Sequence, residues 1–398
     1  MRIALVSREF PPTRQAGGIA TYTAKAARAL AEAGNEVHVL SEAHPGAPVG
    51  TLVHGVTVHR LPDPDARPRE VKVLRRAWDV DRALRRLGPF DLVQCCEWEG
   101  EAALFALHAT APLVTRLATP RHVVEEINET SRRERRRSAM VRRLERLQTV
   151  HSTRVICPSR ALSERVAKDW GLSAGAIEIV PTGISRPTVD PAAPLPEAGL
   201  EGREYVLYFG RLEARKGVRE WLDALPAVLA RHPELLAAFA GDDLGMSDGR
   251  SYADYGRARC GDRAGRLVFL PRMPQAQLFP LISRARVVVL PSRWESLANA
   301  CLEAMALGRA VVSTSGSGFA EVITDGLDGL LVPPDDAQAL ARAVDRVLAD
   351  PALAARLGAA AARRALDYDL SRMTGRLMEV HQEVVRSKAP WATEESSP

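Results

Sequence analysis

The chain has 398 residues, of which 46% are apolar and 26% charged, and its formal net charge is +5. That length exceeds what one hydrophobic core usually supports, so we expect two domains of roughly 150 to 200 residues. No apolar run approaches the roughly 18 residues of a membrane-spanning helix, which argues against an integral membrane protein. Five cysteines without a Cys-x-x-Cys pair indicate reduced thiols and neither a disulfide framework nor a zinc site.

The opening segment MRIALVSRE has one short apolar stretch, which Arg8 and Glu9 end. It lacks the small-residue cleavage site of a secretion signal, so the pattern predicts a first strand. We therefore expect a cytoplasmic protein.

Short runs rich in Val, Leu and Ile alternate with helical patterns through the first half of the chain. This alternation is typical of a doubly wound, mostly parallel sheet in an α/β protein, because parallel neighbours need a crossover helix. The expected strands are residues 2–7, 36–41, 56–61, 91–96, 111–117 and 154–159 in the first half, and residues 204–210, 235–241, 266–271, 286–292 and 309–315 in the second.

The densest basic stretch runs from Ser131 to Leu147. Such a stretch can bind a nucleic acid or an anionic membrane surface, or it can simply be the solvated face of a helix. No aromatic residue interleaves with these arginines to stack on bases, so we expect no nucleic-acid partner. Peripheral membrane contact through Arg132 to Arg146 stays open.

A proline-rich stretch, RPTVDPAAPLPEAGLEG, interrupts the pattern, and the strand and helix alternation then restarts. Pro226 should kink or split the helix that it interrupts. The sequence predicts two Rossmann-like domains that face each other across a cleft. Their bounds are 1–185, a linker at 186–202, a second domain at 203–370, a helix at 371–387 that returns to the first domain, and a flexible tail at 388–398.

Two strand-to-helix loops have the composition of anion sites. In open parallel sheets, ligands bind where a strand ends and the next helix directs its N-terminal amides at them. The first loop contains Gly17 and Gly18, which allow a close backbone approach, and the second contains Arg211 and Lys216. Lysine is rare in this chain, and two cations beside a helix start suit a diphosphate, although a solvated basic loop is the alternative.

Two glutamates flank the start of a later helix in the segment WESLANACLEAMALG. We expect this helix to begin near Ser296 or Asn299, either of which is a good cap. Glu295 then precedes the helix and Glu303 lies about one turn into it, so both carboxylates can reach one ligand. The free amides of Leu297, Ala298 and Asn299 lie between them. This arrangement predicts a sugar nucleotide, with hydroxyl groups on either side of a diphosphate; two unrelated surface glutamates are the alternative.

At these residues the chain resembles the glycosyltransferase family 4 enzymes, which have the two-Rossmann-domain GT-B architecture. The resemblance spans residues 1 to about 385 and rests on the Gly-Gly loop, GRLEARKG, ESLANACLEAMALG and AVVSTSGSGFAEVITDGLDGLLVPPDD. It implies a retaining, metal-independent enzyme that moves a hexose from a nucleoside diphosphate to an acceptor. A UDP-sugar is the expected donor, with a GDP-sugar as the alternative, and no cofactor is implied.

The resemblance also implies residue roles. Arg211 and Lys216 would bind the diphosphate, Glu303 the ribose, and Glu295 the transferred sugar near its reacting carbon; of these, Arg211, Lys216 and Glu295 are the expected catalytic residues. The resemblance implies further contacts with the two substrates. The amides of Leu297 and Ala298 would contact phosphate, the backbone around Met273 would contact the base, and Gly18 would lie beside phosphate and acceptor. The acceptor would be bound by Glu9, Tyr22, Glu97 and Trp98.

A metal site is not expected. Metal-dependent transferases use an Asp-x-Asp at a strand end, but the aspartate pairs here fall in a loop, a helical pattern and a helix lead-in. The histidines show no ligand spacing for zinc.

One departure from the family concerns Ala118, in RLATP, where related sequences commonly have a histidine near the sugar's reaction centre. His122 is the nearest side chain that could replace it. A sugar-nucleotide-binding protein with altered or no transferase activity is therefore the second hypothesis. A nucleotide-dependent oxidoreductase is a third, but GSGFAE lacks the final glycine of Gly-x-Gly-x-x-Gly and follows a late strand.

Overall fold

The computed structural model describes residues 1–11, 17–43, 50–51, 55–62, 69–128, 130–173, 175–190 and 192–387. The chain divides into two compact units: an N-terminal unit of Met1–Gly183 with Ser371–Pro398, and a C-terminal unit of Ile184–Leu370. The stretch 186–202, predicted as a linker, groups with the C-terminal unit. The predicted tail, residues 388–398, lies outside the described residues.

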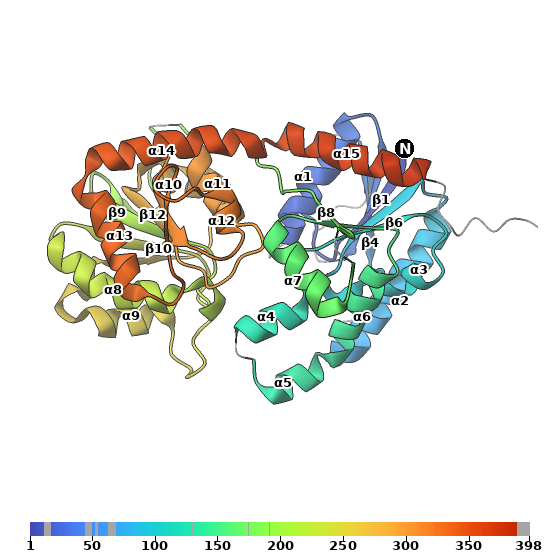
Figure 1. Cartoon of the computed structure of the whole chain (residues 1–398), viewed down its shortest axis with the longest axis horizontal. Helices are drawn as coiled ribbons and strands as arrows, with labels where there is room; N and C mark the ends of the chain where they lie inside the picture. The colour runs from blue at the N-terminus through green and yellow to red at the C-terminus, as the bar shows by residue number, and fades with distance from the viewer. Residues whose placement is uncertain are drawn as a thin grey trace, which may run out of the picture. The chain divides into compact units, whose positions relative to one another are not determined.

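The N-terminal unit contains an eight-stranded sheet in the order β3-β4-β2-β1-β5-β6-β7-β8. Every neighbouring pair is parallel except β3 and β4. The strands are β1 (Arg2–Val6), β2 (Glu36–Glu42), β3 (Gly50–Thr51), β4 (Val56–Leu61), β5 (Leu92–Cys96), β6 (Leu113–Arg116), β7 (Arg154–Cys157) and β8 (Ile177–Ile179) (Figure 1).

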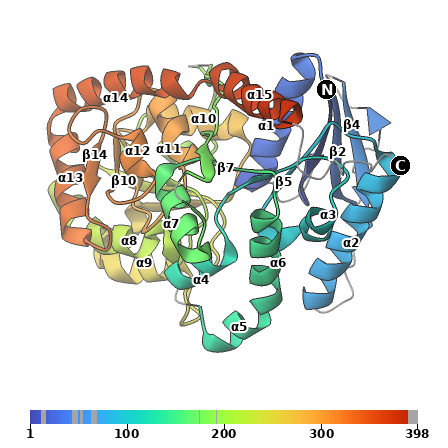
Figure 2. The same cartoon turned by 45° about the vertical axis from the view of Figure 1, so that its right-hand side comes forward.

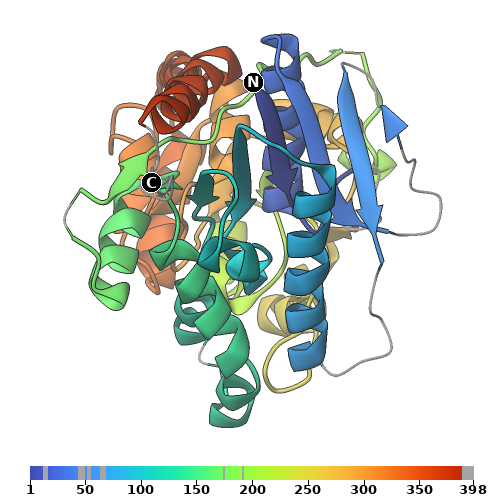
Figure 3. The ribbon, with the colours of Figure 1, turned by 90° about the vertical axis from the view of Figure 1, so that its right-hand side faces the viewer.

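Helices cover both faces of this sheet. On one face, α1 (Gly18–Glu32) and α15 (Leu370–Arg386) pack on residues such as Ile3 and Val39. On the other, α2 (Arg69–Leu87) and α3 (Ala103–Leu107) pack on residues such as Ala4 and Val93. Figures 2 and 3 show α2 beside α6. The other helices of the unit are α4 (Arg121–Ile127), α5 (Arg132–Arg137), α6 (Ala139–Val150) and α7 (Arg160–Trp170).

The C-terminal unit contains a six-stranded sheet in the order β11-β10-β9-β12-β13-β14, with every pair parallel. Numbered along the unit, this is the Rossmann order 3-2-1-4-5-6. The predicted doubly wound α/β fold is thereby confirmed for both units. The strands are β9 (Tyr205–Phe209), β10 (Leu236–Ala240), β11 (Leu267–Leu270), β12 (Val287–Leu290), β13 (Val311–Thr314) and β14 (Leu330–Val332). The short strands β3, β8 and β14 were not among those predicted.

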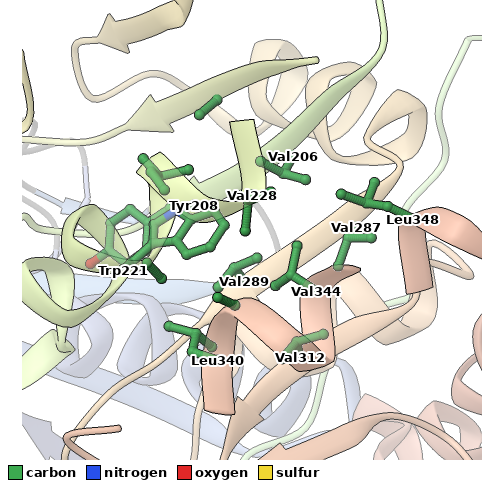
Figure 4. Packing of buried hydrophobic residues seen from close by; sticks show 14 of the residues in the cluster. Val206, Tyr208, Trp221, Val228, Val287, Val289, Val312, Leu340, Val344 and Leu348 are labelled. Atoms are coloured by element: carbon green, nitrogen blue, oxygen red, sulfur yellow. The ribbon is translucent and has the colours of Figure 1, made fainter. Parts of the chain in front are cut away.

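The core of the C-terminal unit lies on both faces of its sheet, because successive strand residues point to opposite sides. Val206 and Tyr208 of β9 face α8 (Val218–Arg231) and α13 (Ala337–Ala349), as Figure 4 shows. Leu207 and its odd-numbered neighbours face the opposite layer, to which α10 and α11 belong. The remaining helices are α9 (Tyr252–Cys260), α10 (Gln275–Arg284), α11 (Asn299–Ala306), α12 (Phe319–Val322) and α14 (Pro351–Ala365).

The structure differs from the sequence-based expectation in two local details. Helix α8 is not split but runs through Pro226, since most of its apolar side chains are buried in the core and packing outweighs the local preference. Helix α11 begins at Asn299, as expected, but Ala298 occupies the N-cap position and no side chain caps it. Asn299 already lies inside the helix, and within the described part of the chain its side-chain oxygen has no hydrogen-bond partner.

The last helix, α15, carries an apolar stripe that packs in the N-terminal unit. Leu377, Val380 and Val384 are buried in the same core cluster as α1 and the apolar residues of one face of the N-terminal sheet. His381 hydrogen bonds through Nε2 to the side-chain oxygen of Gln94 at 2.7 Å. Within the described residues, no helix is both long and apolar enough to cross a membrane.

Candidate active site

The C-terminal sheet reverses its strand order between β9 and β12, which lie side by side. A ligand crevice forms at such a point because the loops that leave the two strands diverge to opposite faces. The loop after β9 contains Arg211, Arg215 and Lys216, and the loop after β12 contains Glu295. The fold therefore brings three cations and a carboxylate to one edge of the sheet.

Glycines allow these loops to meet backbone to backbone. Gly217 has φ of +65°, and a Cβ added there would lie 1.9 Å from the carbonyl oxygen of Pro291. A Cβ on Gly318 would lie 2.0 Å from the carbonyl oxygen of Ser296, and the Gly318 amide donates to the Glu295 carbonyl at 2.9 Å. Three loops are thus packed so closely that Glu295 has a fixed position.

Glu295 forms the centre of a buried ionic cluster, with 6% of its surface exposed. Its carboxylate is ion-paired with the Lys216 ammonium, and the Arg215 guanidinium lies 3.4 Å away. The Ser292 hydroxyl donates to the same oxygen at 3.0 Å. Burial alone would raise the pKa of Glu295, but Lys216 and Arg215 outweigh it and hold this pKa at about 2. Burial lowers the pKa of Lys216, and the charge of Glu295 opposes that change.

Arg215 was not predicted, yet it contacts the cluster more closely than Arg211 does. Arg215 is buried, and it donates to the Trp294 carbonyl at 3.2 Å and to Glu213 at 2.9 Å. The Arg211 side chain is 57% exposed, and Glu213, at 3.1 Å, is its ion-pair partner. The position next to Lys216 was the only sequence signal for Arg215, since nothing in GRLEARKG distinguishes a buried arginine from an exposed one.

The start of α11 presents unused amide groups near Glu295. Leu297 and Ala298 have buried side chains, and neither N–H donates to an acceptor among the residues that the structure describes. Free N–H groups at a helix start, with the positive end of the helix dipole, attract anions. This local geometry suits a phosphate group.

Glu303 lies further along α11 and is half-buried. Its carboxylate accepts a hydrogen bond from Gln275 Nε2 at 2.9 Å, which connects it to the start of α10. Met273, two residues before Gln275, packs at the edge of the same apolar layer. The predicted ribose and base contacts therefore lie on two adjoining elements of one unit.

The N-terminal unit holds the other predicted residues, at the carboxyl ends of β1 and β5. Glu9 accepts a hydrogen bond from the Gly17 amide at 3.1 Å and so fixes the entry to α1, where Gly18 is the first residue. Residues 12–16 of the Gly-Gly loop lie outside the described residues. The Tyr22 hydroxyl accepts from Gln94 at 3.1 Å, and the Arg116 guanidinium lies 3.8 Å from the Tyr22 ring centre.

Glu97 is fully buried at the end of β5. One carboxyl oxygen accepts from the Ala118 amide at 2.7 Å and from the Cys96 thiol at 3.0 Å. The other has no hydrogen-bond partner among the residues that the structure describes. Burial raises the pKa of Glu97 to about 7. Glu145, also buried, has its pKa raised by desolvation and by the charge of Glu97. Trp98 is half-buried beside Arg121, whose guanidinium lies 5.6 Å from the ring centre.

His122, the suggested replacement for a histidine at position 118, has a different partner. Its Nε2 lies 2.9 Å from Asp169 Oδ2, and its ring lies against Trp170 at 5.4 Å. The structure therefore places His122 in a contact between α4 and α7. The side chain that the Ala118 amide contacts is the Glu97 carboxyl group.

Each unit has a Rossmann-like sheet, as a GT-B glycosyltransferase has in both of its domains, and comparisons with known proteins identify the class of this chain. Residues 16–186 match the family model "Glycosyltransferase Family 4", and residues 196–364 match "Glycosyl transferases group 1". The phosphatidyl-myo-inositol mannosyltransferase of Mycolicibacterium smegmatis is 30% identical over 377 residues, which cover 92% of this chain and 90% of that protein. A glycosyltransferase of Methanocaldococcus jannaschii is 29% identical over 362 residues, which cover 88% of this chain and 90% of that protein.

Solved structures share the fold. Sucrose-phosphate synthase from Thermosynechococcus elongatus superposes with a TM-score of 0.80 at 24% identity, covering 97% of this chain and 99% of that one. Anabaena HepE in complex with UDP-glucose superposes with a TM-score of 0.74 at 19% identity, and the match covers 96% of this chain and 100% of that one. The chain belongs to the glycosyltransferase family 4 enzymes of the GT-B fold. It is a glycosyltransferase.

Proposed function

We propose that this glycosyltransferase moves a hexose from a nucleoside diphosphate to an acceptor hydroxyl, with retention of configuration and without a metal ion. The observation that carries the proposal is the ion pair of Lys216 with Glu295 beside the free amides of Leu297 and Ala298. Arg215 and Arg211 add two further cations and Glu213 adds a second carboxylate, so three cations against two carboxylates leave the cluster with a formal charge of +1 that can bind a diphosphate.

We propose one orientation for the donor in this site. The diphosphate lies against Lys216 and the α11 amides, the ribose hydroxyls donate to Glu303, and a hydroxyl of the hexose donates to Glu295. Arg211, at the exposed entry of the same loop, is proposed to close over the outer phosphate. A UDP-sugar is the expected donor, with a GDP-sugar as the alternative. This donor is a substrate, and the proposal includes no separate cofactor.

The reaction breaks the bond between the anomeric carbon and the diphosphate oxygen, and it forms a bond between that carbon and the acceptor oxygen. The acceptor proton goes to the departing phosphate oxygen on the same face of the sugar, which is the retaining mechanism that the family resemblance implies. Negative charge develops on the diphosphate, and Lys216, the arginines and the helix amides stabilise it as a metal ion would. Glu295 orients Lys216 and the sugar together.

The acceptor is proposed to bind the N-terminal unit near Glu9, Tyr22, Glu97 and Trp98. A small metabolite, a saccharide and a lipid-linked molecule are all compatible with these groups. One relative is named for a phosphatidyl-myo-inositol acceptor, which favours including lipids. We further propose that the enzyme is cytoplasmic, that it has no nucleic-acid partner, and that it contacts the membrane peripherally through Arg132 to Arg146.

Incubation with UDP-glucose, UDP-N-acetylglucosamine and GDP-mannose tests this function. We expect one donor to be hydrolysed slowly in EDTA, with release of the sugar as its α-anomer in the first turnovers. Binding of a donor without hydrolysis or transfer to any acceptor would favour the second hypothesis, a sugar-nucleotide-binding protein altered by Ala118. Activity that EDTA abolishes and Mg²⁺ restores would contradict metal independence.

A further inference from the structure

Arg293 lies two residues before Glu295, in the loop that leaves β12, and its backbone joins that loop to the loop after β9. The Arg293 N–H donates to the carbonyl oxygen of Arg215 at 2.9 Å. The Arg215 guanidinium in turn donates to the Trp294 carbonyl at 3.2 Å. The two loops are therefore connected by reciprocal hydrogen bonds immediately before Glu295.

The side chain of Arg293 contacts two further elements. Its Nη2 donates to Oε1 of Glu220, in the first turn of α8, at 3.0 Å. Its Nε lies 2.6 Å from Oδ1 of Asp335, in the loop between β14 and α13. A guanidinium can bridge two carboxylates in this way because its N–H groups point outward in a rigid planar fork. Arg293 therefore links the segments that follow β9, β12 and β14.

Both acidic partners need this arginine. The Glu220 side chain is only 13% exposed, and among the described residues its second carboxylate oxygen has no hydrogen-bond partner. Such a carboxylate destabilises a folded protein if its cation is removed. Asp335 has a left-handed backbone with φ of +61° and directly precedes Asp336, the N-cap of α13. A backbone of this kind persists where surrounding contacts hold it, and Arg293 supplies one of them.

Glu295 lies between two separately held points of its loop. On the amino side is Arg293, next to Ser292, whose hydroxyl donates to the Glu295 carboxylate at 3.0 Å. On the carboxyl side, Ser296 packs against Gly318, whose amide donates to the Glu295 carbonyl at 2.9 Å. The unused amides at the start of α11 follow the second point. Loosening the first point should therefore move the carboxylate and leave those amides in place.

We propose that Arg293 is a positioning residue of the donor site, which holds the Glu295 carboxylate at the transferred hexose. Arg293 acts through Glu295 and Ser292 and does not itself contact the donor in the proposed orientation. The inference rests on the proposed function, because it needs Glu295 to contact the hexose. Since a small displacement of a group at the reacting carbon strongly slows a reaction, Arg293 should affect turnover far more than nucleotide affinity.

A double variant separates positioning from stability. Arg293→Met with Glu220→Gln removes the bridge but leaves no unpaired carboxylate in the half-buried position, so its thermal midpoint should stay within about 5 °C of the wild type. Hydrolysis of whichever donor the wild type accepts, among UDP-glucose, UDP-N-acetylglucosamine and GDP-mannose, should fall roughly tenfold or more. Isothermal titration with the matching nucleoside diphosphate should show an affinity change of less than about twofold.

Two further variants complete the experiment. Arg293→Lys keeps the positive charge but cannot bridge both carboxylates, so it should fold and also hydrolyse the donor more slowly. Arg231→Met with Asp345→Asn is the matched control, because it removes a 3.0 Å ion pair from the other end of α8. This control should hydrolyse the donor at the wild-type rate.

The possible results distinguish this inference from the proposed function. Wild-type hydrolysis rates in both Arg293 variants would overturn the positioning role and leave the proposed function intact. An equal loss of hydrolysis and of diphosphate affinity would also overturn it, because the whole loop and not Glu295 alone would then have moved. A wild type that hydrolyses none of the three donors would overturn the proposed function and, with it, this inference.

Discussion

The Lys216 ammonium and the Glu295 carboxylate form an ion pair although they are 79 residues apart in the sequence. They meet because β9 and β12 are neighbours at the point where the strand order reverses. Glu295 is also held by Arg215 and Ser292, so removing Lys216 changes both the charge of the site and the position of its carboxylate.

Lys216→Ala should lower turnover by a hundredfold or more, on the order of 3 kcal/mol of lost charge stabilisation. It should also lower the free energy of unfolding, because Glu295 keeps only Arg215 as a cationic partner. Steady-state kinetics and urea unfolding measure the two effects. Lys168→Ala, at an exposed lysine of α7, is the matched control, and equal turnover in the two variants would remove Lys216 from the site.

Glu303→Gln should weaken nucleoside diphosphate binding about tenfold, because an amide is a poorer acceptor for two ribose hydroxyls than a carboxylate. Isothermal titration calorimetry with the diphosphate alone measures this change without the transferred sugar. Glu234→Gln, at an exposed residue before β10, controls for the loss of one negative charge. Should the affinity of Glu303→Gln match that of the control, the ribose assignment is wrong.

Glu295 should make stability fall in acid. Its folded pKa of about 2 lies below its ordinary value of 4.5, so the unfolded chain takes up the proton first. The stabilisation is complete above about pH 4.5 and is lost as pH falls toward 2, with a limit of about 3 kcal/mol. Unfolding of the wild type and of Glu295→Gln between pH 3 and 6 measures the difference, which should grow with pH. A constant difference would contradict the depressed pKa.

Glu97 should have the opposite effect. Its folded pKa of about 7 lies above 4.5, so between these values the folded protein holds a proton that the unfolded chain has released. Stability should therefore fall as pH rises from about 4.5 through 7. Glu97→Gln keeps an acceptor for the Ala118 amide and cannot ionise. It should gain stability relative to the wild type between pH 5 and 8, by up to about 3 kcal/mol. A gain that does not change with pH would refute this assignment.

Gly217→Ala should destabilise the protein and abolish activity, because its Cβ would lie 1.9 Å from the Pro291 carbonyl oxygen. Gly202→Ala is the control for backbone conformation: its φ of +68° is close to the +65° of Gly217, but no atom lies within 4 Å of its added Cβ. The control should cost about 1 kcal/mol of unfolding free energy from the left-handed conformation alone. Thermal unfolding of both variants separates the clash from the backbone strain.

The periodicity of the sequence was sufficient to predict the α/β class and the principal strands, because buried parallel strands are continuous apolar runs. The edge strands β3, β8 and β14 were missed, since such short runs have no clear period. Pro226 does not split α8, one of the two outcomes predicted for it, because the buried apolar face of the helix outweighs the local preference.

The candidate site was predictable in part. Lys216 was noticeable because lysine is rare here, and Glu295 and Glu303 because they flank an apolar helix. The burial of Arg215 and the contact of Glu97 with Ala118 depend on the crossing of separate loops and strands. Composition and spacing carry no information about such contacts between distant segments.

Isothermal titration of the wild type, Lys216→Ala and Lys168→Ala with UDP, GDP, ADP and dTDP tests the central claim most directly. We predict that the wild type and Lys168→Ala bind one of these diphosphates alike, and that Lys216→Ala binds it at least tenfold more weakly. Equal affinity in all three proteins, or no binding of any diphosphate to the wild type, would contradict a donor site at Lys216 and Glu295.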